Sequence, residues 1–154
     1  MLIRILKFVE NLLASLKELK FTKSITSNLD LTYFTITEFD SPDELGSGYR
    51  MNKDFIRRLD TARGIAGIPF KINSGYRTAA HNTKIGGRVG SSHKKGLAVD
   101  IAYKGSRERY LIINALMIVG VNRFGIGKTF IHADVDKNKD EDVIWLYWAT
   151  KFEY

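Results

Sequence analysis

Apolar and polar residues alternate along two stretches in the second half of the chain, residues 97–103 and 130–136. Alternation with a period of two predicts β-strands, whose successive side chains point to opposite faces. In the first stretch Val99 and Ile101 would face a core, and Asp100 would point the other way. Aspartate is disfavoured in strands, and a half-buried charge is costly unless it is paired or bound to a cation. Asp100 is therefore the first candidate for a residue that binds a cation or takes part in catalysis.

Helical periodicity predicts two well-delimited helices in the same part of the chain. One covers residues 53–66, with Asn52 as its N-cap and Gly67 closing it. The other covers residues 106–119 and stops at Gly120.

Shorter patterns predict the remaining elements of this part. Thr78 is expected to cap a short helix that ends before Gly86. Further strands are expected over residues 31–40, 70–74 and 143–148. Helices and strands do not alternate regularly, which favours an α+β fold with a small antiparallel sheet and flanking helices.

The first thirty residues have a different pattern. An apolar stripe between residues 2 and 19 predicts an amphipathic helix, and the polar residues that follow predict a linker. Glu10 and Asn11 interrupt the apolar centre that a signal peptide would need, so none is expected. The chain is accordingly divided into an N-terminal helix and linker, residues 1–30, and one domain, residues 31–154. The helix is expected to contact the domain, a partner chain or a membrane surface.

Composition narrows the possible functions. The chain of 154 residues contains no cysteine, which excludes disulfides, thiolate metal sites and cysteine nucleophiles. The formal net charge of +7 favours a polyanionic partner, either an anionic cell wall or membrane surface or a nucleic acid. A nucleic-acid binder rests on this charge and the aromatic content alone, and no nucleic-acid partner is expected.

Histidine is scarce, with three in the whole chain, and two of them suggest a metal site. By alternation His132, Asp134 and Asp136 share one face of their strand. If that strand pairs with residues 97–103, His132 lies beside Asp100, and His93 precedes Asp100 by one loop. Two histidines and one carboxylate form the protein part of many catalytic zinc sites, although other divalent metals accept the same ligands. The alternative is a hydrogen-bonded strand histidine and a surface aspartate.

Several motifs together resemble a known family. They are SGYRT at 74–78, HN at 81–82, IGG at 85–87, SSHKKGLAVDI at 91–101 and FIHADVD at 130–136. With FTITEFDSP at 34–42 they resemble the zinc D-Ala-D-Ala carboxypeptidase family, which includes phage endolysin peptidases acting on peptidoglycan. The resemblance covers about residues 32–136 and implies a single hedgehog/DD-peptidase-like domain.

The resemblance also implies roles for individual residues. His93, Asp100 and His132 would be the ligands of a zinc ion (Zn²⁺). Arg77 would face the substrate, where it binds a carboxylate or polarises the scissile carbonyl and stabilises the oxyanion. Zinc suits this chemistry because it activates water near neutral pH and polarises a carbonyl group.

The expected catalytic base departs from the family pattern. Many members carry Glu or Asp three residues before the last zinc histidine, where this chain has Thr129. Asp134 is the best candidate for the base, and its alternative role is to orient a histidine. Ser92 is expected to fix the His93 loop and contact substrate, and His81 to line the site or act structurally.

These expectations combine into one functional hypothesis. The chain is expected to be a zinc metallopeptidase that hydrolyses an amide bond in the stem peptides of peptidoglycan, as a carboxypeptidase or an endopeptidase. A lytic enzyme of phage type is favoured, acting on the wall outside the cytoplasm after release by a holin or delivery in a virion. The alternative is a non-catalytic cell-wall-binding or virion module that keeps the peptidase fold.

Three minor patterns remain. Residues 136–142 resemble the opening of a calcium loop, but Glu141 stands where glycine is needed, so a solvated hairpin tip is expected. Gly125 and Gly127 predict a tight turn before the last strands. Trp145 and Tyr147 share a strand face and predict either core packing or a sugar-stacking surface.

Overall fold

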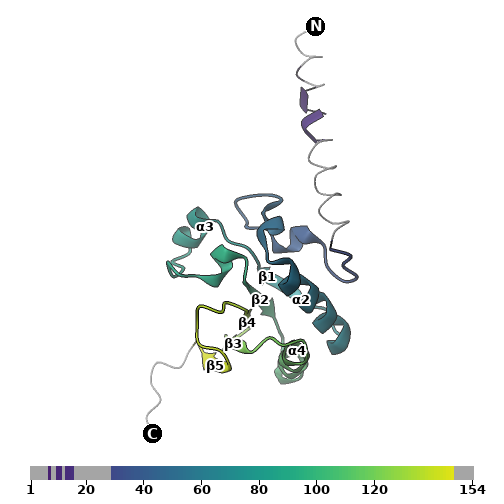
Figure 1. Ribbon diagram of the computed structural model, residues 1–154, viewed down its shortest axis with the longest axis vertical. Coiled ribbons are helices and arrows are strands. Elements are labelled where there is room, and N and C mark those ends of the chain that lie inside the picture. The colour runs from purple at the N-terminus through teal and green to yellow at the C-terminus, as the bar shows by residue number, and fades with distance from the viewer. Residues whose placement is uncertain (1–6, 8–9, 12, 16–28, 148–154) are drawn as a thin grey trace. The chain divides into compact units, whose positions relative to one another are not determined.

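The computed structural model describes residues 7, 10–11, 13–15 and 29–147 of the chain (Figure 1). Residues 1–30 and 31–154 form two separate compact units. In the first unit residues 7, 10–11 and 13–15 are helical. The predicted amphipathic helix and linker fall mostly outside the described residues and stay a prediction. In the described part, no helix combines the length and apolar character that crossing a membrane requires.

The α-helices of the second unit lie where the sequence pattern predicts them. α2 is Lys53–Ala66, and the Asn52 side chain accepts a hydrogen bond from the Phe55 N–H at 2.9 Å. α3 is Ala79–Lys84, capped by the Thr78 hydroxyl, and α4 is Ser106–Ile118. All three predicted helices in this region are confirmed, because capping and periodicity are local properties of the sequence.

The strands of the second unit form one mixed sheet. Its strands are β1 Lys71–Ser74, β2 Ala98–Ala102, β3 Arg123–Ile126, β4 Phe130–Asp134 and β5 Val143–Leu146, in the spatial order β1-β2-β4-β3-β5. The first three pairings are antiparallel, and β5 pairs in parallel with β3. The predicted α+β class is confirmed. The sheet departs from a wholly antiparallel one at this edge, because the chain after β4 crosses back to the free side of β3.

Two other expectations differ from the structure. Residues 31–40 contain a 3-10 helix, η1 Ile36–Phe39, in place of the expected strand. The Asp60 carboxylate on α2 accepts hydrogen bonds from the backbone N–H groups of residues 32–34. These N–H groups are therefore bonded to a helix and not to a neighbouring strand. Gly125 lies inside β3, a strand that was not predicted, whereas Gly127 lies in the turn between β3 and β4, where its N–H donates to the Phe130 carbonyl.

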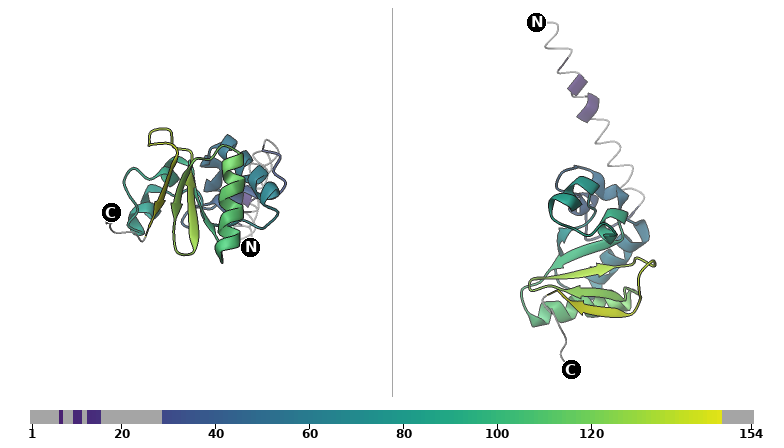
Figure 2. Two further views of the ribbon diagram at one scale, coloured as in Figure 1. Left: turned by 90° about the horizontal axis from the view of Figure 1, so that it is seen from below. Right: turned by 90° about the vertical axis from the view of Figure 1, so that its left-hand side faces the viewer.

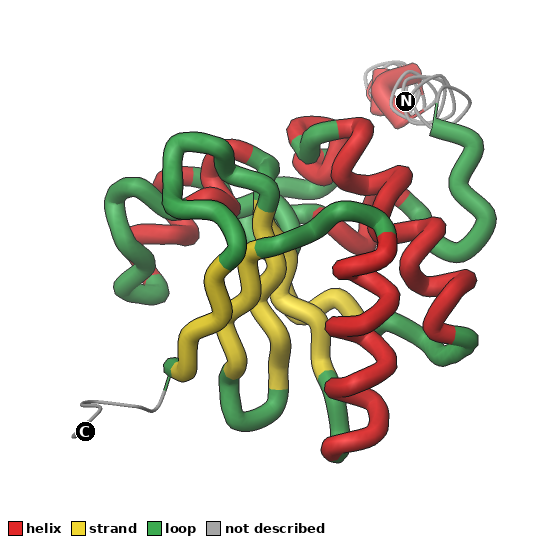
Figure 3. Tube along the Cα trace, turned by 60° about the horizontal axis from the view of Figure 1, so that its bottom comes forward, coloured by secondary structure: helices red, strands yellow, loops and turns green. Residues whose placement is uncertain are grey.

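The two faces of the sheet have different surroundings. α2 and α4 pack against each other and lie together on one side of the strands (Figures 2 and 3). Fully buried apolar residues fill the space between these helices and the sheet, including Val99, Ile101, Ile131, Ala133 and Phe124. Because side chains alternate along each strand, Asp100 and His132 point to the opposite face. That face carries the candidate site.

Candidate metal centre

The site is built on one transverse row of the sheet. Ser74, Asp100, His132, Gly125 and Trp145 are register partners in turn, one from each strand. Directly paired residues point to the same face, so this row lies on the face away from α2 and α4. The register places Asp100 beside His132, as the sequence predicted if the two strands paired.

His93 reaches the row from a short 3-10 helix, η3 Ser92–Lys95. Gly96 ends η3 in the left-handed region at φ +67°, with its α-carbon packed against the backbone of Arg50 and Met51, so no side chain fits there. The His93 Nδ1 lies 2.8 Å from the Gly75 carbonyl oxygen. Since a carbonyl only accepts, Nδ1 carries the hydrogen and Nε2 presents its lone pair.

Three ligand atoms converge at one point. His132 Nδ1 lies 2.9 Å from Asp100 Oδ1 and 3.2 Å from His93 Nε2, and His93 Nε2 lies 3.3 Å from Asp100 Oδ1. Tetrahedral zinc ligands at about 2.0–2.2 Å from the ion stand roughly 3.3 Å from one another. His93, Asp100 and His132 are buried and grouped as zinc would require.

Arg77 holds the second oxygen of Asp100. Its Nη2 donates to Asp100 Oδ2 at 2.6 Å, and its Nε donates to the Ser74 hydroxyl at 2.8 Å. A guanidinium that donates to two different side chains at once has little freedom to turn. Arg77 therefore keeps Asp100 oriented with Oδ1 toward the two histidines.

Asp134 holds the other nitrogen of His132. His132 Nε2 lies 3.1 Å from Asp134 Oδ2, while Arg123 Nε donates to Asp134 Oδ1 at 2.9 Å. The backbone N–H of Asp136 donates to the same Oδ1 at 3.1 Å, and Asp134 is fully buried. With Nε2–H held by a carboxylate, the lone pair of His132 is on Nδ1, the atom that faces Asp100 and His93.

Burial and hydrogen bonding set the protonation of the three ligands. Burial lowers the pKa of His93, which favours the neutral imidazole that a metal requires. Burial opposes a charged Asp100, but its close contacts with the His132 and His93 rings outweigh burial and hold the pKa of Asp100 well below its ordinary value. For His132 burial lowers the pKa, and its bonds to Asp100 and Asp134 reverse that effect and raise it.

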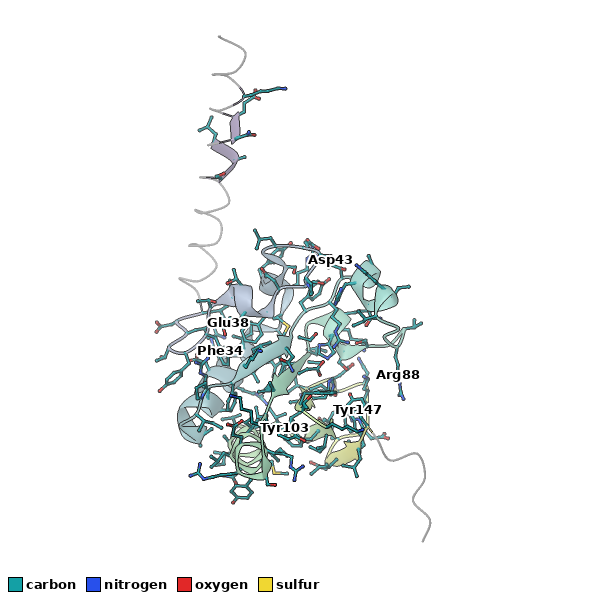
Figure 4. All side chains as sticks on the ribbon, turned by 180° about the vertical axis from the view of Figure 1, so that it is seen from behind. Phe34, Glu38, Asp43, Arg88, Tyr103 and Tyr147 are labelled. Carbon is teal, nitrogen blue, oxygen red and sulfur yellow. The ribbon has the colours of Figure 1, made fainter. Side chains whose placement is uncertain are left out.

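A cavity of about 850 Å³ opens above these residues. The three candidate ligands line it together with the aromatic side chains of Phe130, Trp145 and Tyr147 and basic side chains that include Arg88 and Lys139. Figure 4 shows Arg88 and Tyr147 on the same side of the molecule. The arrangement is a buried cluster of candidate metal ligands that lines a polar and aromatic cavity large enough for a peptide segment.

A family model described as Peptidase M15 matches residues 32–134, more than half of the chain. The chain belongs to the peptidase M15 family. This is the zinc D-Ala-D-Ala carboxypeptidase family that the motifs resemble, and its members are zinc-dependent metallopeptidases. No curated protein matches the chain.

The site of this M15 member contains most of the residues expected from the sequence. Arg77, Ser92 and Asp134 line the cavity together with the three ligand candidates. His81 lies on α3 and is not among the lining residues, and neither is Thr129, whose carbonyl accepts from the Tyr103 N–H. The roles of all these residues stay predictions.

Some site residues of this M15 member were missed. Arg123 binds Asp134, but it lies in β3, which the pattern did not predict. Asp136 is fully buried and accepts from Ser92 at 3.0 Å and Lys95 at 2.9 Å, so it fixes the loop that carries His93. The alternation of residues 130–136 placed Asp136 on the face of His132, but its role as the partner of Ser92 and Lys95 was not predicted.

Proposed function

We propose that the protein is a zinc-dependent peptidase that hydrolyses an amide bond in the peptide part of peptidoglycan. The observation that carries the proposal is the triangle of His93 Nε2, Asp100 Oδ1 and His132 Nδ1, with sides of 2.9–3.3 Å. Membership of the M15 family supports it. The proposal covers both D-Ala-D-Ala carboxypeptidase and endopeptidase activity.

Each neighbouring residue then has a defined part in the chemistry. Zinc would supply an activated water and polarise the scissile carbonyl. Arg77 lines the cavity beside Asp100, so its guanidinium both orients that ligand and presents positive charge where an oxyanion develops. Trp145 and Tyr147 are aromatic walls of the cavity that exclude water from one side of a bound peptide.

Asp134 fits the orienting role better than the role of base. Its two oxygens already receive hydrogen bonds from Arg123, His132 and the Asp136 backbone. A carboxylate held in this way has little capacity left for a substrate proton. We therefore assign Asp134 to fixing the tautomer and ring position of His132.

The biological setting we propose is lysis of the bacterial cell wall by an enzyme of the phage type. The net charge of +7 supports it, because wall polymers are polyanionic and attract a basic protein. The competing function is a cell-wall-binding or virion module without turnover. Thr129, at the position where many relatives have an acidic base, favours that alternative.

Metal content and fragment analysis test the proposal. Purified protein should contain about one zinc ion per chain, and mass spectrometry should detect peptide fragments released from purified peptidoglycan. Absence of both would overturn the proposal. Zinc without released fragments would identify the non-catalytic module.

The first prediction concerns His93→Ala, with His81→Ala as the matched control. Removing His93 deletes one of the three ligands, so both bound zinc and hydrolysis should be lost. His81 lies outside the residues lining the cavity, so its variant should keep zinc and activity near those of the wild type. Zinc is measured by elemental analysis and hydrolysis by fragment release. Equal zinc content in both variants would show that the site is elsewhere.

A further inference from the structure

Basic residues outnumber acidic ones around the cavity. Its lining contains Arg77, Arg88, Arg123 and Lys139, against two carboxylates, Asp100 and Asp134. Arg77 is paired with Asp100, and Arg123 is paired with Asp134. These two pairs are balanced, so the excess positive charge belongs to Arg88 and Lys139.

Lys139 is only partly neutralised. The fully buried carboxylate of Asp136 lies 2.9 Å from Lys95 Nζ and 4.0 Å from Lys139 Nζ, so two ammonium groups share one negative charge. Lys139 donates one hydrogen bond, to the Ser92 hydroxyl at 2.7 Å. An ammonium group has three donors, and two of them remain for a ligand. The bond to Ser92 holds Nζ next to the loop of His93.

Arg88 has no partner for its guanidinium among the described residues. It lies in the loop between α3 and η3, whose residues Gly86, Gly87, Gly90 and Ser91 also line the cavity. The backbone carbonyl of Arg88 accepts from the Asn82 side chain at 3.1 Å and from the Ser91 N–H, which anchors the loop at this residue. A fixed backbone with an unpaired, exposed guanidinium at a cavity suits recognition of a planar anion.

We propose that Arg88 and Lys139 form a carboxylate-binding subsite of the cavity, separate from the Arg77–Asp100 pair. The subsite rests on the proposed function and specifies its substrate as a peptide with a free carboxylate in addition to the scissile amide. Such a carboxylate is either the C-terminal one or one on a side chain near the scissile bond. Charge-assisted hydrogen bonds from the two cations anchor it, and the aromatic walls contact the rest of the peptide.

The test uses the zinc-loaded protein and peptides containing the bond that fragment analysis identifies. One peptide keeps all its carboxylates, a second is amidated at the C-terminus, a third on the side chain, and a fourth at both. Steady-state kinetics gives KM and kcat for each peptide. Calorimetry gives Kd for analogues in which a ketomethylene group replaces the scissile amide.

The variants are Arg88→Ala, Lys139→Ala and the double variant. Lys84→Ala and Lys137→Ala are matched controls, because each removes one nearby exposed charge that does not line the cavity. Each subsite variant should raise Kd and KM for the free-carboxylate peptide roughly tenfold, with a much smaller change in kcat. Binding of the doubly amidated peptide should not change, and the control variants should match the wild type.

The amidated peptides identify the source of the carboxylate. Loss of affinity on C-terminal amidation alone assigns the subsite to the terminal carboxylate, and loss on side-chain amidation alone assigns it to the side chain. Equal affinity of the wild type for all four peptides, or an unchanged Kd in the double variant, would overturn the subsite. If hydrolysis persists in that case, the proposed function stands while the subsite fails. If no peptide is hydrolysed at all, the proposed function fails.

Discussion

His132 has two ring nitrogens, and its neighbours determine which of them carries the hydrogen and which has a free lone pair. Asp134 lies 3.1 Å from Nε2, and Nδ1 is directed at Asp100 and His93. The same principle holds for His93, whose Nδ1 is held by the Gly75 carbonyl. At the scale of single residues, the orientation of the candidate ligands therefore depends on the partners of their ring nitrogens.

Replacing Asp134 by Asn distinguishes its two possible roles. If Asp134 orients His132, zinc Kd should rise about 10–100-fold, because an amide holds the imidazole less strongly than a carboxylate does. Competition with a fluorescent chelator measures this Kd. Asp140→Asn, an exposed aspartate in the next loop, is the control and should bind zinc like the wild type. Unchanged zinc affinity with lost turnover would instead identify Asp134 as the base.

Gly125 is the one position of the transverse row without a side chain. A β-carbon there would lie 2.6 Å from atoms of both the Trp145 and the Tyr147 rings, which fold over the glycine. Gly125→Ala should therefore lower the free energy of unfolding by about 1–3 kcal/mol and displace the aromatic walls. Urea denaturation measures the first effect and tryptophan fluorescence the second. Gly90→Ala, whose added β-carbon meets open space, should change neither.

At the scale of elements, β2 and β4 are adjacent inner strands of the sheet and carry two of the three candidate ligands. Both are buried, and their five-residue register leaves one alignment that keeps Val99 and Ala133 in the core. A shift by one residue would move every side chain to the opposite face. The core and the metal site are thus specified by the same register.

A second contact at the scale of elements joins α2 to residues 32–34 near the start of the second unit. Asp60 on α2 accepts three backbone hydrogen bonds, at 2.9, 2.8 and 3.2 Å, from residues 32–34. Asp60→Ala should lower the free energy of unfolding by about 2–3 kcal/mol, because it leaves these N–H groups without their charged acceptor. Asp54→Ala, on the exposed face of the same helix, should cost less than about 1 kcal/mol. Equal losses in chemical denaturation would contradict the anchoring role.

At the scale of the whole molecule, buried carboxylates connect stability to pH. Burial opposes the charge of Asp136, but hydrogen bonds from Lys95 and Ser92 outweigh it and lower the pKa of Asp136. A group whose pKa is lower in the folded state stabilises the fold above its unfolded pKa of about 3.9. That stabilisation is lost as the pH falls from about 4 through the lower folded value.

The corresponding prediction compares the wild type with Asp136→Asn. At pH 6 the wild type should be the more stable, and the difference should shrink as the pH falls below about 4. Urea denaturation at a series of pH values, with chelator present to remove metal, measures both curves. Asp142→Asn, an exposed aspartate, should follow the wild-type curve. Parallel curves for Asp136→Asn and the wild type would show that Asp136 does not contribute.

The sequence by itself determined α2, α3 and α4, the strands β2 and β4, and the identity of the metal-ligand candidates. Capping residues such as Asn52 and Thr78 act on their own turns, and alternation separates Asp100 and His132 from the apolar face without knowledge of the neighbours. The spacing of motifs was also enough to indicate the family. These properties are local, so they can be read along the chain.

Only the tertiary structure decided how the candidates act together. The parallel position of β5 brings Trp145 and Tyr147 over Gly125, and the crossing of the chain before β5 brings Lys139 to the cavity. The pairing of Arg123 with Asp134 and of Arg77 with Asp100 left the charge of Arg88 unpaired within the described part of the chain and that of Lys139 only partly neutralised by Asp136. Such partners are far apart in sequence, and tertiary packing determines which of the many possible pairs of charged residues become neighbours. Periodicity and propensity contain no information about that choice.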